Sequence, residues 1–113
     1  MALIAALLLT LIAPQAEGEG LMSYQETVRC AGLTQAASEL EGGESPRGRT
    51  LFDAALYWSL ASGQAATAAG RPAATADADQ TRERISAVRD LSEQTNSAPL
   101  ALEACLRRTP DLG

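Results

Sequence analysis

Two cysteines, Cys30 and Cys105, are the residues whose chemistry this sequence predicts most directly, because they are its only thiols. In an oxidising compartment a lone pair of cysteines forms a disulfide. A redox-active dithiol is a weaker alternative, since the sequence holds no Cys-x-x-Cys motif. Two free, buried cysteines in a reducing compartment are the other alternative. The predicted disulfide therefore depends on whether the protein is exported.

An apolar run near the N-terminus indicates export. Residues 2–13 are twelve uncharged residues, the length of a signal-peptide core, whereas a membrane-spanning helix needs about 20. Ala16 offers a small residue before a possible cleavage point, although no basic residue precedes the run. We expect a signal peptide over residues 1–16, a flexible segment over 17–22 and a helical domain over 23–113. Contact with a membrane is expected only if the leader is retained as an anchor.

Residues that commonly carry catalysis or bind metals are scarce. The chain has no histidine, which excludes the ordinary Ser-His-Asp and Cys-His arrangements and any imidazole ligand for zinc or haem. Asp77 and Asp79 are two residues apart and point to different sides of a helix, so we assign them to a helical first turn and not to a metal. Asp53 is likewise expected to serve as a capping acid. A hydrolase built on carboxylates alone remains open, but no spacing selects a pair; we predict no enzyme, no cofactor and no metal.

Tyr57 and Trp58 are the candidates for contact with another molecule. Adjacent helical residues point about 100° apart, so one narrow stripe cannot bury both side chains. The favoured interpretation is that Trp58 is buried and Tyr57 is half-buried. The alternative is an aromatic contact patch for a partner or an apolar ligand, because Trp and Tyr often anchor interfaces.

Four helices are expected to position these residues. Ser23-Tyr-Gln-Glu26 is a capping box that starts the first helix, and Gly42-Gly43 ends it. Thr50 is expected to start the second helix after a polar turn, and Pro99 fits the first turn of the fourth. No segment alternates apolar and polar residues as a strand would. The first two expected helices span residues 23–41 and 50–69. The third begins between 75 and 77 and runs to about 93, and the fourth has Pro99 in its first turn and stops at Thr109-Pro110.

Apolar spacing predicts which face of each helix is buried. The second helix has two adjacent apolar or small stripes and is expected to be the most buried of the four. Together the helices predict an all-α, up-and-down bundle, in which Cys30 and Cys105 lie at similar heights on antiparallel neighbours. A disulfide closing a loop of about 75 residues would contribute roughly 4.5 kcal/mol. The expected inner face of the first helix is Cys30, Leu33, Ala37 and Leu40. On the second helix the two stripes are Phe52, Leu56, Ser59, Gly63 and Ala66, and Leu51, Ala55, Trp58, Ser62, Ala65 and Ala69. On the third helix the face is Ala78, Thr81, Ile85, Val88 and Ser92, and on the fourth it is Leu102, Cys105 and Leu106.

Charge and composition narrow the function further. A net charge of −5 argues against binding to nucleic acid or to anionic lipid. All nine basic residues are arginine and alanine is abundant, which is typical of a GC-rich bacterial genome. In size, disulfide and helical character the chain resembles small periplasmic acid-stress chaperones of the HdeA type. That resemblance implies acid-triggered exposure of apolar surface, as acids such as Glu39, Glu41 and Asp90 become protonated.

The leading expectation is a small, non-enzymatic protein of the bacterial periplasm, or a secreted one, that acts through contact with an unidentified protein partner. One alternative is a carrier that holds a small apolar ligand between helices, beside Ser59, Gly63 and Ala66. The other alternative is the acid-stress chaperone.

Overall fold

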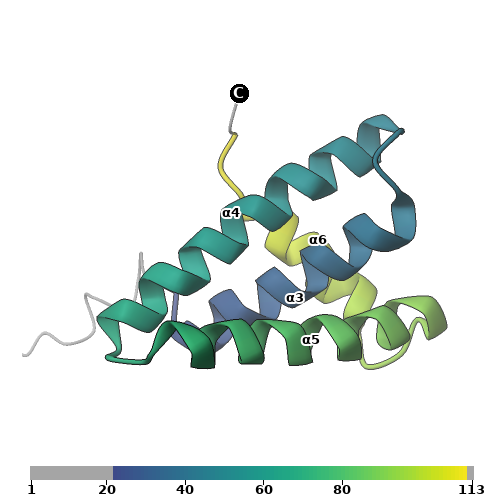
Figure 1. Ribbon diagram of the computed structural model, residues 1–113. Coiled ribbons are helices and arrows are strands. Elements are labelled where there is room, and N and C mark those ends of the chain that lie inside the picture. Colours follow the sequence, from purple (N-terminus) through teal and green to yellow (C-terminus); the bar gives the residue numbers. More distant parts are fainter. Residues whose placement is uncertain (1–21, 112–113) are drawn as a thin grey trace, which may run out of the picture.

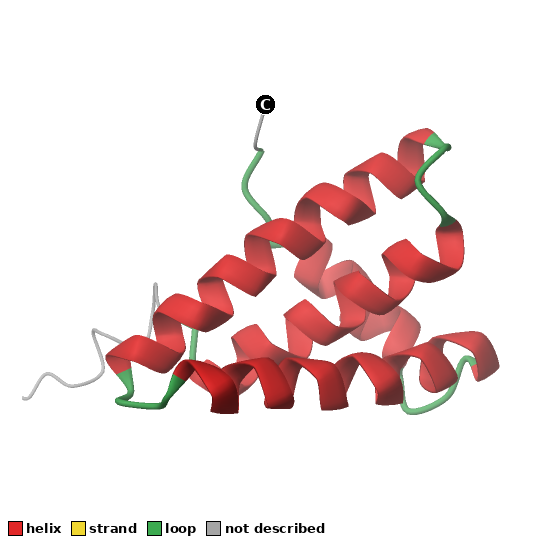
Figure 2. Ribbon diagram, in the orientation of Figure 1, coloured by secondary structure: helices red, strands yellow, loops and turns green. Residues whose placement is uncertain are grey.

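Four helices make up the part of the chain that the computed structural model describes, residues 22–111. They are α3 (Tyr24–Glu41), α4 (Pro46–Ala68), α5 (Ala73–Glu93) and α6 (Ala98–Arg107). Consecutive helices run in opposite directions (Figure 1) and are joined by short loops, with no strand between residues 22 and 111 (Figure 2). The predicted all-α, up-and-down arrangement of four helices is confirmed.

Local cap chemistry sets the ends of α3 and the start of α6, as predicted. The Ser23 hydroxyl accepts a hydrogen bond from the Glu26 amide at 3.1 Å, and the Glu26 carboxylate accepts one from the Ser23 amide at 2.9 Å. At the other end of α3, Gly42 takes a φ of +84°, a conformation that glycine adopts without steric cost. Pro99 stands in the first turn of α6, where its missing N–H costs no hydrogen bond.

The predicted start of α4 at Thr50 is wrong, because the helix begins at Pro46. The Ser45 hydroxyl accepts a hydrogen bond from the Gly48 amide at 2.9 Å, and Pro46 has the fixed φ that suits the first helical position. Because Gly48 has no side chain, the backbone at the end of α3 lies very close to the start of α4: a Cβ built on Gly48 would lie 1.8 Å from the Gly42 carbonyl oxygen. The segment predicted as a polar turn is therefore largely helical. At α5 the difference is smaller, a start at residue 73 instead of 75 to 77.

α3 is the central helix and packs against α4, α5 and α6. It is also the most buried helix, so the expectation that α4 would be most buried is wrong. α3 and α5 approach closely at a glycine: a Cβ built on Gly32 would lie 2.5 Å from the Glu83 Cβ. α4 and α5 lie close at the loop that joins them and diverge toward their other ends (Figure 1). The largest fully buried side chains are Trp58, Leu51, Thr34 and Ser62.

The predicted inner face of α5 is wrong. Ile85 is 59% exposed, and Ala78 and Thr81 are also on the surface. The buried residues of α5 are instead Ala76 and Ala87. Two further residues of that predicted face are also more exposed than expected: Val88 is only partly buried and Ser92 is exposed.

Two contacts explain this rotation of α5. The close approach at Gly32 brings the Glu83 side of α5 against α3. One end of the same side is fixed by the Tyr24 hydroxyl, which donates a hydrogen bond to Asp79 at 2.8 Å. Backbone proximity and a polar contact therefore decide which face of α5 is buried.

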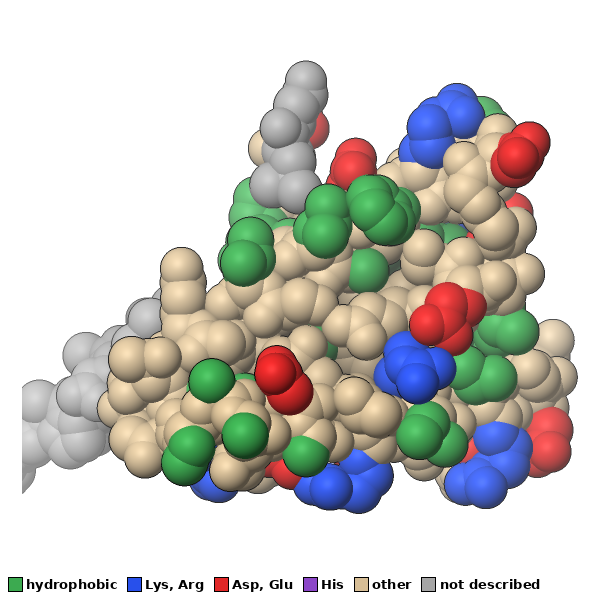
Figure 3. All heavy atoms as spheres, in the orientation of Figure 1, with side chains coloured by type: hydrophobic (Ala, Val, Ile, Leu, Met, Phe, Trp, Pro, Cys, Tyr) green, Lys and Arg blue, Asp and Glu red, His purple; other side chains and the backbone are tan. Residues whose placement is uncertain are grey.

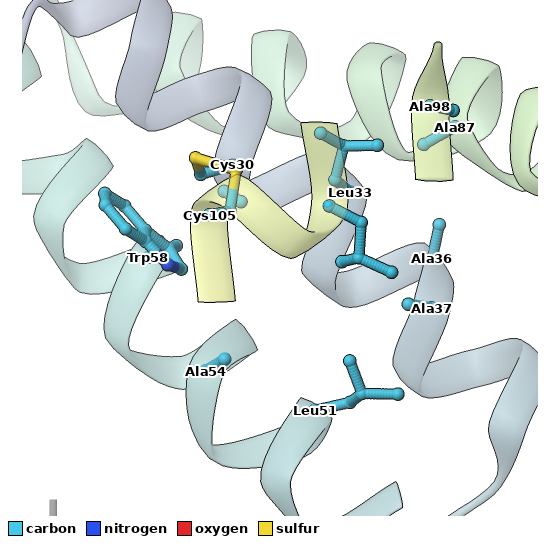
Figure 4. Packing of buried hydrophobic residues seen from close by; sticks show 12 residues of the cluster. Cys30, Leu33, Ala36, Ala37, Leu51, Ala54, Trp58, Ala87, Ala98 and Cys105 are labelled. Carbon is cyan, nitrogen blue, oxygen red and sulfur yellow. A yellow bond between two sulfur atoms is a disulfide. The ribbon is translucent and has the colours of Figure 1, made fainter. Parts of the chain in front are cut away.

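The disulfide between Cys30 and Cys105 joins α3 to α6, as predicted. The two Cα atoms are 5.6 Å apart, a usual separation for a disulfide. Both residues belong to the main core cluster, and in Figure 4 the bridge lies beside the Trp58 ring of α4. Leu33, Ala37, Leu102 and Leu106 are at least partly buried near it, whereas Leu40, predicted on the same face of α3, is 51% exposed.

Candidate functional site

The outer face of α4 carries three large apolar side chains in a row, which we call the apolar ridge: Phe52, Leu56 and Leu60. Their exposed fractions are 54%, 50% and 69%. Residues four apart lie on one side of a helix, so the three form a continuous line. Hydrophobic side chains along this edge of α4 are visible in Figure 3. The prediction that Phe52 and Leu56 are buried is therefore wrong; of the two stripes predicted on α4, the one with Leu51, Ala55, Trp58 and Ser62 faces the core.

The ridge lies on a helix whose surface is unusually free of charge. Residues 54–70 contain no Asp, Glu, Lys or Arg. A helix that only separates a core from water normally places charged residues on its outer face. Depletion of charge together with an exposed aromatic side chain such as Phe52 is what the centre of a protein interface shows. The ridge is accordingly the strongest candidate for a contact surface.

A groove lies beside the ridge, between α3, α4 and α5. Its volume is about 340 Å³, and Phe52 and Leu56 form its apolar wall. Polar residues line it as well: the Gln35 side-chain amide donates a hydrogen bond to the Ser59 hydroxyl at 2.6 Å, and another to the amide oxygen of Gln80 at 3.4 Å. An exposed ion pair between Arg84 and Glu39, with N and O 3.3 Å apart, closes the far side.

Trp58, one of the two residues predicted to contact a partner or ligand, is a core residue. Its side chain is 2% exposed, and its indole N–H donates a hydrogen bond to the Thr109 hydroxyl at 2.8 Å. Tyr57 is half-buried and meets the Trp58 ring edge-on, with 4.9 Å between ring centroids. A partner that docked on α4 would reach Tyr57 but not the indole. Contact through Tyr57 stays a prediction.

The three small residues predicted to line a ligand pocket do not share one surface. Ser59 lines the groove described above. Ala66 is 2% exposed and packs in a small core cluster with Tyr24, Val28 and Ala76. Gly63 faces outward, because a Cβ built there meets no atom within 4 Å.

The carboxylates singled out by the sequence are scattered. The prediction that Asp53 is a capping acid is wrong, because α4 begins seven residues earlier at Pro46 and its first turn contains no acidic residue. Asp53 is exposed and borders a cavity of about 310 Å³ next to the C-terminal segment that follows α6. The assignment of Asp77 and Asp79 to a helical first turn is wrong, because α5 begins at Ala73 and its first turn contains no acidic residue. Asp77 is exposed, whereas Asp79 forms an ion pair with Arg82. Among residues 22–111 no group of three or more Asp, Glu, Cys or His side chains is placed to hold a metal ion.

Asp79 also belongs to a polar cluster that connects the start of α3 to α5. It accepts the Tyr24 hydroxyl bond, and the Arg71 guanidinium lies 4.5 Å from the centre of the Tyr24 ring. Burial raises the pKa of Tyr24 above its usual value of 10.0, and the bond to Asp79 raises it further. Arg71 and Arg82 partly oppose this rise. The tyrosine is therefore held in its neutral, hydrogen-bond-donating form.

Within the described residues, no helix has the length and apolar character needed to cross a membrane. Comparison of the chain with protein families, with curated proteins and with solved structures returns no match. The candidate site therefore stands on its own geometry. Sequence reasoning missed the ridge as a surface, although the charge-free stretch over residues 54–70 was a signal that could have found it.

Proposed function

We propose that this chain is a small, exported, non-enzymatic protein that acts by docking another protein on the apolar ridge of α4. The observation that carries the proposal is the alignment of Phe52, Leu56 and Leu60 on α4, each of them half-exposed or more. From residue 54 to its C-terminal end this helix contains no charged residue. A contiguous exposed apolar surface of this kind commonly marks a protein contact site. The described residues leave half or more of each of these three side chains uncovered.

Export is supported by the disulfide. A bridge between Cys30 and Cys105 is typical of proteins that leave the reducing cytosol. The apolar run over residues 2–13, which lies outside the described residues, has the composition of a signal-peptide core. We place the protein in the periplasm or outside the cell.

The fold supports the ridge with a rigid frame. Directly behind it, Leu51, Ala54 and Trp58 of α4 are buried against the core that includes the disulfide. A surface held in one conformation before binding loses less conformational entropy when it binds. A docking role therefore agrees with the way α4 is fixed.

Site-specific photo-crosslinking in secreting cells tests the proposal. A photoreactive residue at position 56 is expected to give an adduct of defined mass. Position 100 is the matched control, because Leu100 is an exposed leucine, 74% exposed, on the separate helix α6. The adduct should disappear when Leu60 is changed to Asp. Absence of any protein adduct at position 56, or equal labelling at position 100, would contradict docking on the ridge.

The groove beside the ridge favours a second candidate, a carrier for a small amphipathic ligand. Its apolar wall at Phe52 and Leu56 and its polar lining at Gln35 would suit a molecule with one apolar and one polar side. Native mass spectrometry of protein isolated gently from its host tests this candidate. A bound mass that is lost in a Leu56→Asp variant would support it, whereas only unliganded protein would argue against it.

A further inference from the structure

Gly63 is a glycine without a structural reason inside the described fold. It lies well inside α4, where glycine weakens a helix relative to alanine. Gly32 and Gly48 differ, because in each case neighbouring atoms of this chain fill the place of a side chain. A Cβ at position 63 meets nothing within 4 Å. The glycine therefore leaves open space on the outer surface of α4 where another residue would have a side chain, and we call this space the hollow.

That hollow lies on the same line as the ridge. At about 100° per residue, Gly63 is only about 20° around the helix from Leu56. Ser59, also small and partly exposed, lies along the near side of the same face. Along this line the face has large side chains, Phe52 and Leu56, toward its N-terminal end and small ones, Ser59 and Gly63, toward its C-terminal end, while Leu60 lies about 40° to the other side of Leu56.

Two such faces fit each other when the helices run antiparallel about a two-fold axis. If Phe52 lies over Gly63 of a second copy, the same register places Leu56 over Ser59 of that copy. The two-fold axis repeats both contacts in the opposite sense, as an isologous interface requires. A parallel pair would instead place Phe52 against Phe52 and leave the two hollows empty.

The charges fit this register as well. Arg49 falls beside position 66 of the second copy, in the last turn of its α4. That turn contains no basic residue, and a helix C-terminus carries partial negative charge that attracts a guanidinium group. Arg49 donates one bond to the Glu44 carbonyl oxygen at 3.1 Å and has further N–H donors to offer.

Pairing through this face also reduces the electrostatic repulsion between two copies of like charge. Each copy has a net charge of −5, so two copies repel one another over most approaches. Along residues 54–70 neither copy presents a charge. Asp53 lies at the border of this face, next to the C-terminal segment and away from the line of Leu56 and Gly63.

We infer that the partner of the ridge is a second copy of this chain, bound through an antiparallel pair of α4 helices with Phe52 over Gly63 and Leu56 over Ser59. The inference rests on the proposed function, which makes the ridge a protein contact surface. The seam from Arg49 to Ala66 is about 26 Å long at 1.5 Å per residue. A single helix pair of this length is smaller than the standard interface of about 800 Å² per partner. We therefore expect a dimer with a dissociation constant in the micromolar range.

Sedimentation velocity of the oxidised protein over a concentration series tests the inference. The wild type should shift from monomer to dimer across the micromolar range, and Leu56→Asp should raise the dissociation constant by about tenfold or more. Leu100→Asp, on α6, is the control and should leave it unchanged. A wild type that stays monomeric at high micromolar concentration would overturn the inference.

Gly63→Leu separates a role in the seam from a role in the fold. Because the hollow is open in the monomer, leucine there should raise thermal stability at concentrations too low for the dimer. It should also weaken the dimer about tenfold or more, since the hollow for Phe52 is filled. A dimer unaffected by Gly63→Leu would show that the copies pair through another surface.

Photo-crosslinking from position 52 identifies the seam directly. In a mixture of isotopically light and heavy protein, the cross-linked peptide should join position 52 of one copy to residues around 63 of the other. If the protein is monomeric but position 56 captures a different protein in cells, the second copy is excluded and the proposed function stands. If it is monomeric and position 56 captures nothing, both are refuted.

Discussion

Replacing Ser62 by alanine should stabilise this protein. Ser62 is fully buried, and its hydroxyl oxygen has no hydrogen-bond partner among residues 22–111. It lies on the core-facing stripe of α4, one turn from both Trp58 and Ala66. An unpaired buried hydroxyl lowers stability because water bonds it in the unfolded chain and nothing bonds it in the folded one.

The size of the effect follows from three contributions. Removing the unpaired hydroxyl should stabilise the fold by about 1–3 kcal/mol. Alanine is a better helix former than serine by about 0.5 kcal/mol. The void left by one oxygen atom opposes this by about 0.3 kcal/mol, at about 24 cal/mol per Å³. The net expectation is a stabilisation of at least about 1 kcal/mol, or about 4–8 °C in Tm for a domain of this size.

Urea unfolding followed by circular dichroism measures this change, with a shifted midpoint and an unchanged slope. Ser59→Ala on the same helix is the matched control. Its hydroxyl accepts the Gln35 bond at 2.6 Å, so its removal should be neutral or destabilising by about 0.5–1.5 kcal/mol. If Ser62→Ala lost stability, the hydroxyl would have a bonding partner in solution and the reasoning would be wrong.

Three further predictions concern the frame that holds α4. Reduction of the Cys30–Cys105 disulfide, which closes a 75-residue separation, should cost about 4.5 kcal/mol; a melt unchanged by reductant would refute this. Gly32→Ala should destabilise by about 1–3 kcal/mol, because its Cβ would overlap Glu83 in α5; unchanged urea unfolding would show that α5 can move away. The raised pKa of Tyr24 means that the folded state resists deprotonation, so its contribution is complete below pH 10 and is lost as the pH rises further; Tyr24→Phe should flatten the alkaline decline in stability.

The helix ends that the sequence predicts correctly are those fixed by neighbouring residues. Ser23 with Glu26, and Pro99 in α6, act within one turn of the chain. The prediction for the start of α4 failed because the sequence offers two competing helix starts, Pro46 after Ser45 and Thr50, which lie four residues apart. The earlier signal prevails in the structure, where the Ser45 cap bonds the Gly48 amide and Gly48 itself tolerates contact with Gly42.

The buried faces were harder to predict because alanine lies on every side of these helices. Small side chains give a weak apolar period, so the few large ones dominated the prediction. On α5 this favoured Ile85, which is exposed, over Ala76 and Ala87, which are buried. Which face of α5 is buried depends on Gly32, whose close contact with Glu83 joins residues 51 positions apart in sequence. No local pattern encodes such a contact.

The distribution of large and small side chains separates the ridge from ordinary surface residues. Between residues 22 and 111 the interior is built mostly from alanine, which lets the helices approach closely, while six large apolar residues of this part of the chain remain exposed. Leu40, Ile85 and Leu100 each lie on a different helix, and scattered apolar residues of this kind are normal on protein surfaces. The other three, Phe52, Leu56 and Leu60, align on one helix, which carries no charged residue after Asp53. A docking surface accounts for this alignment, whereas a random distribution of exposed apolar residues does not.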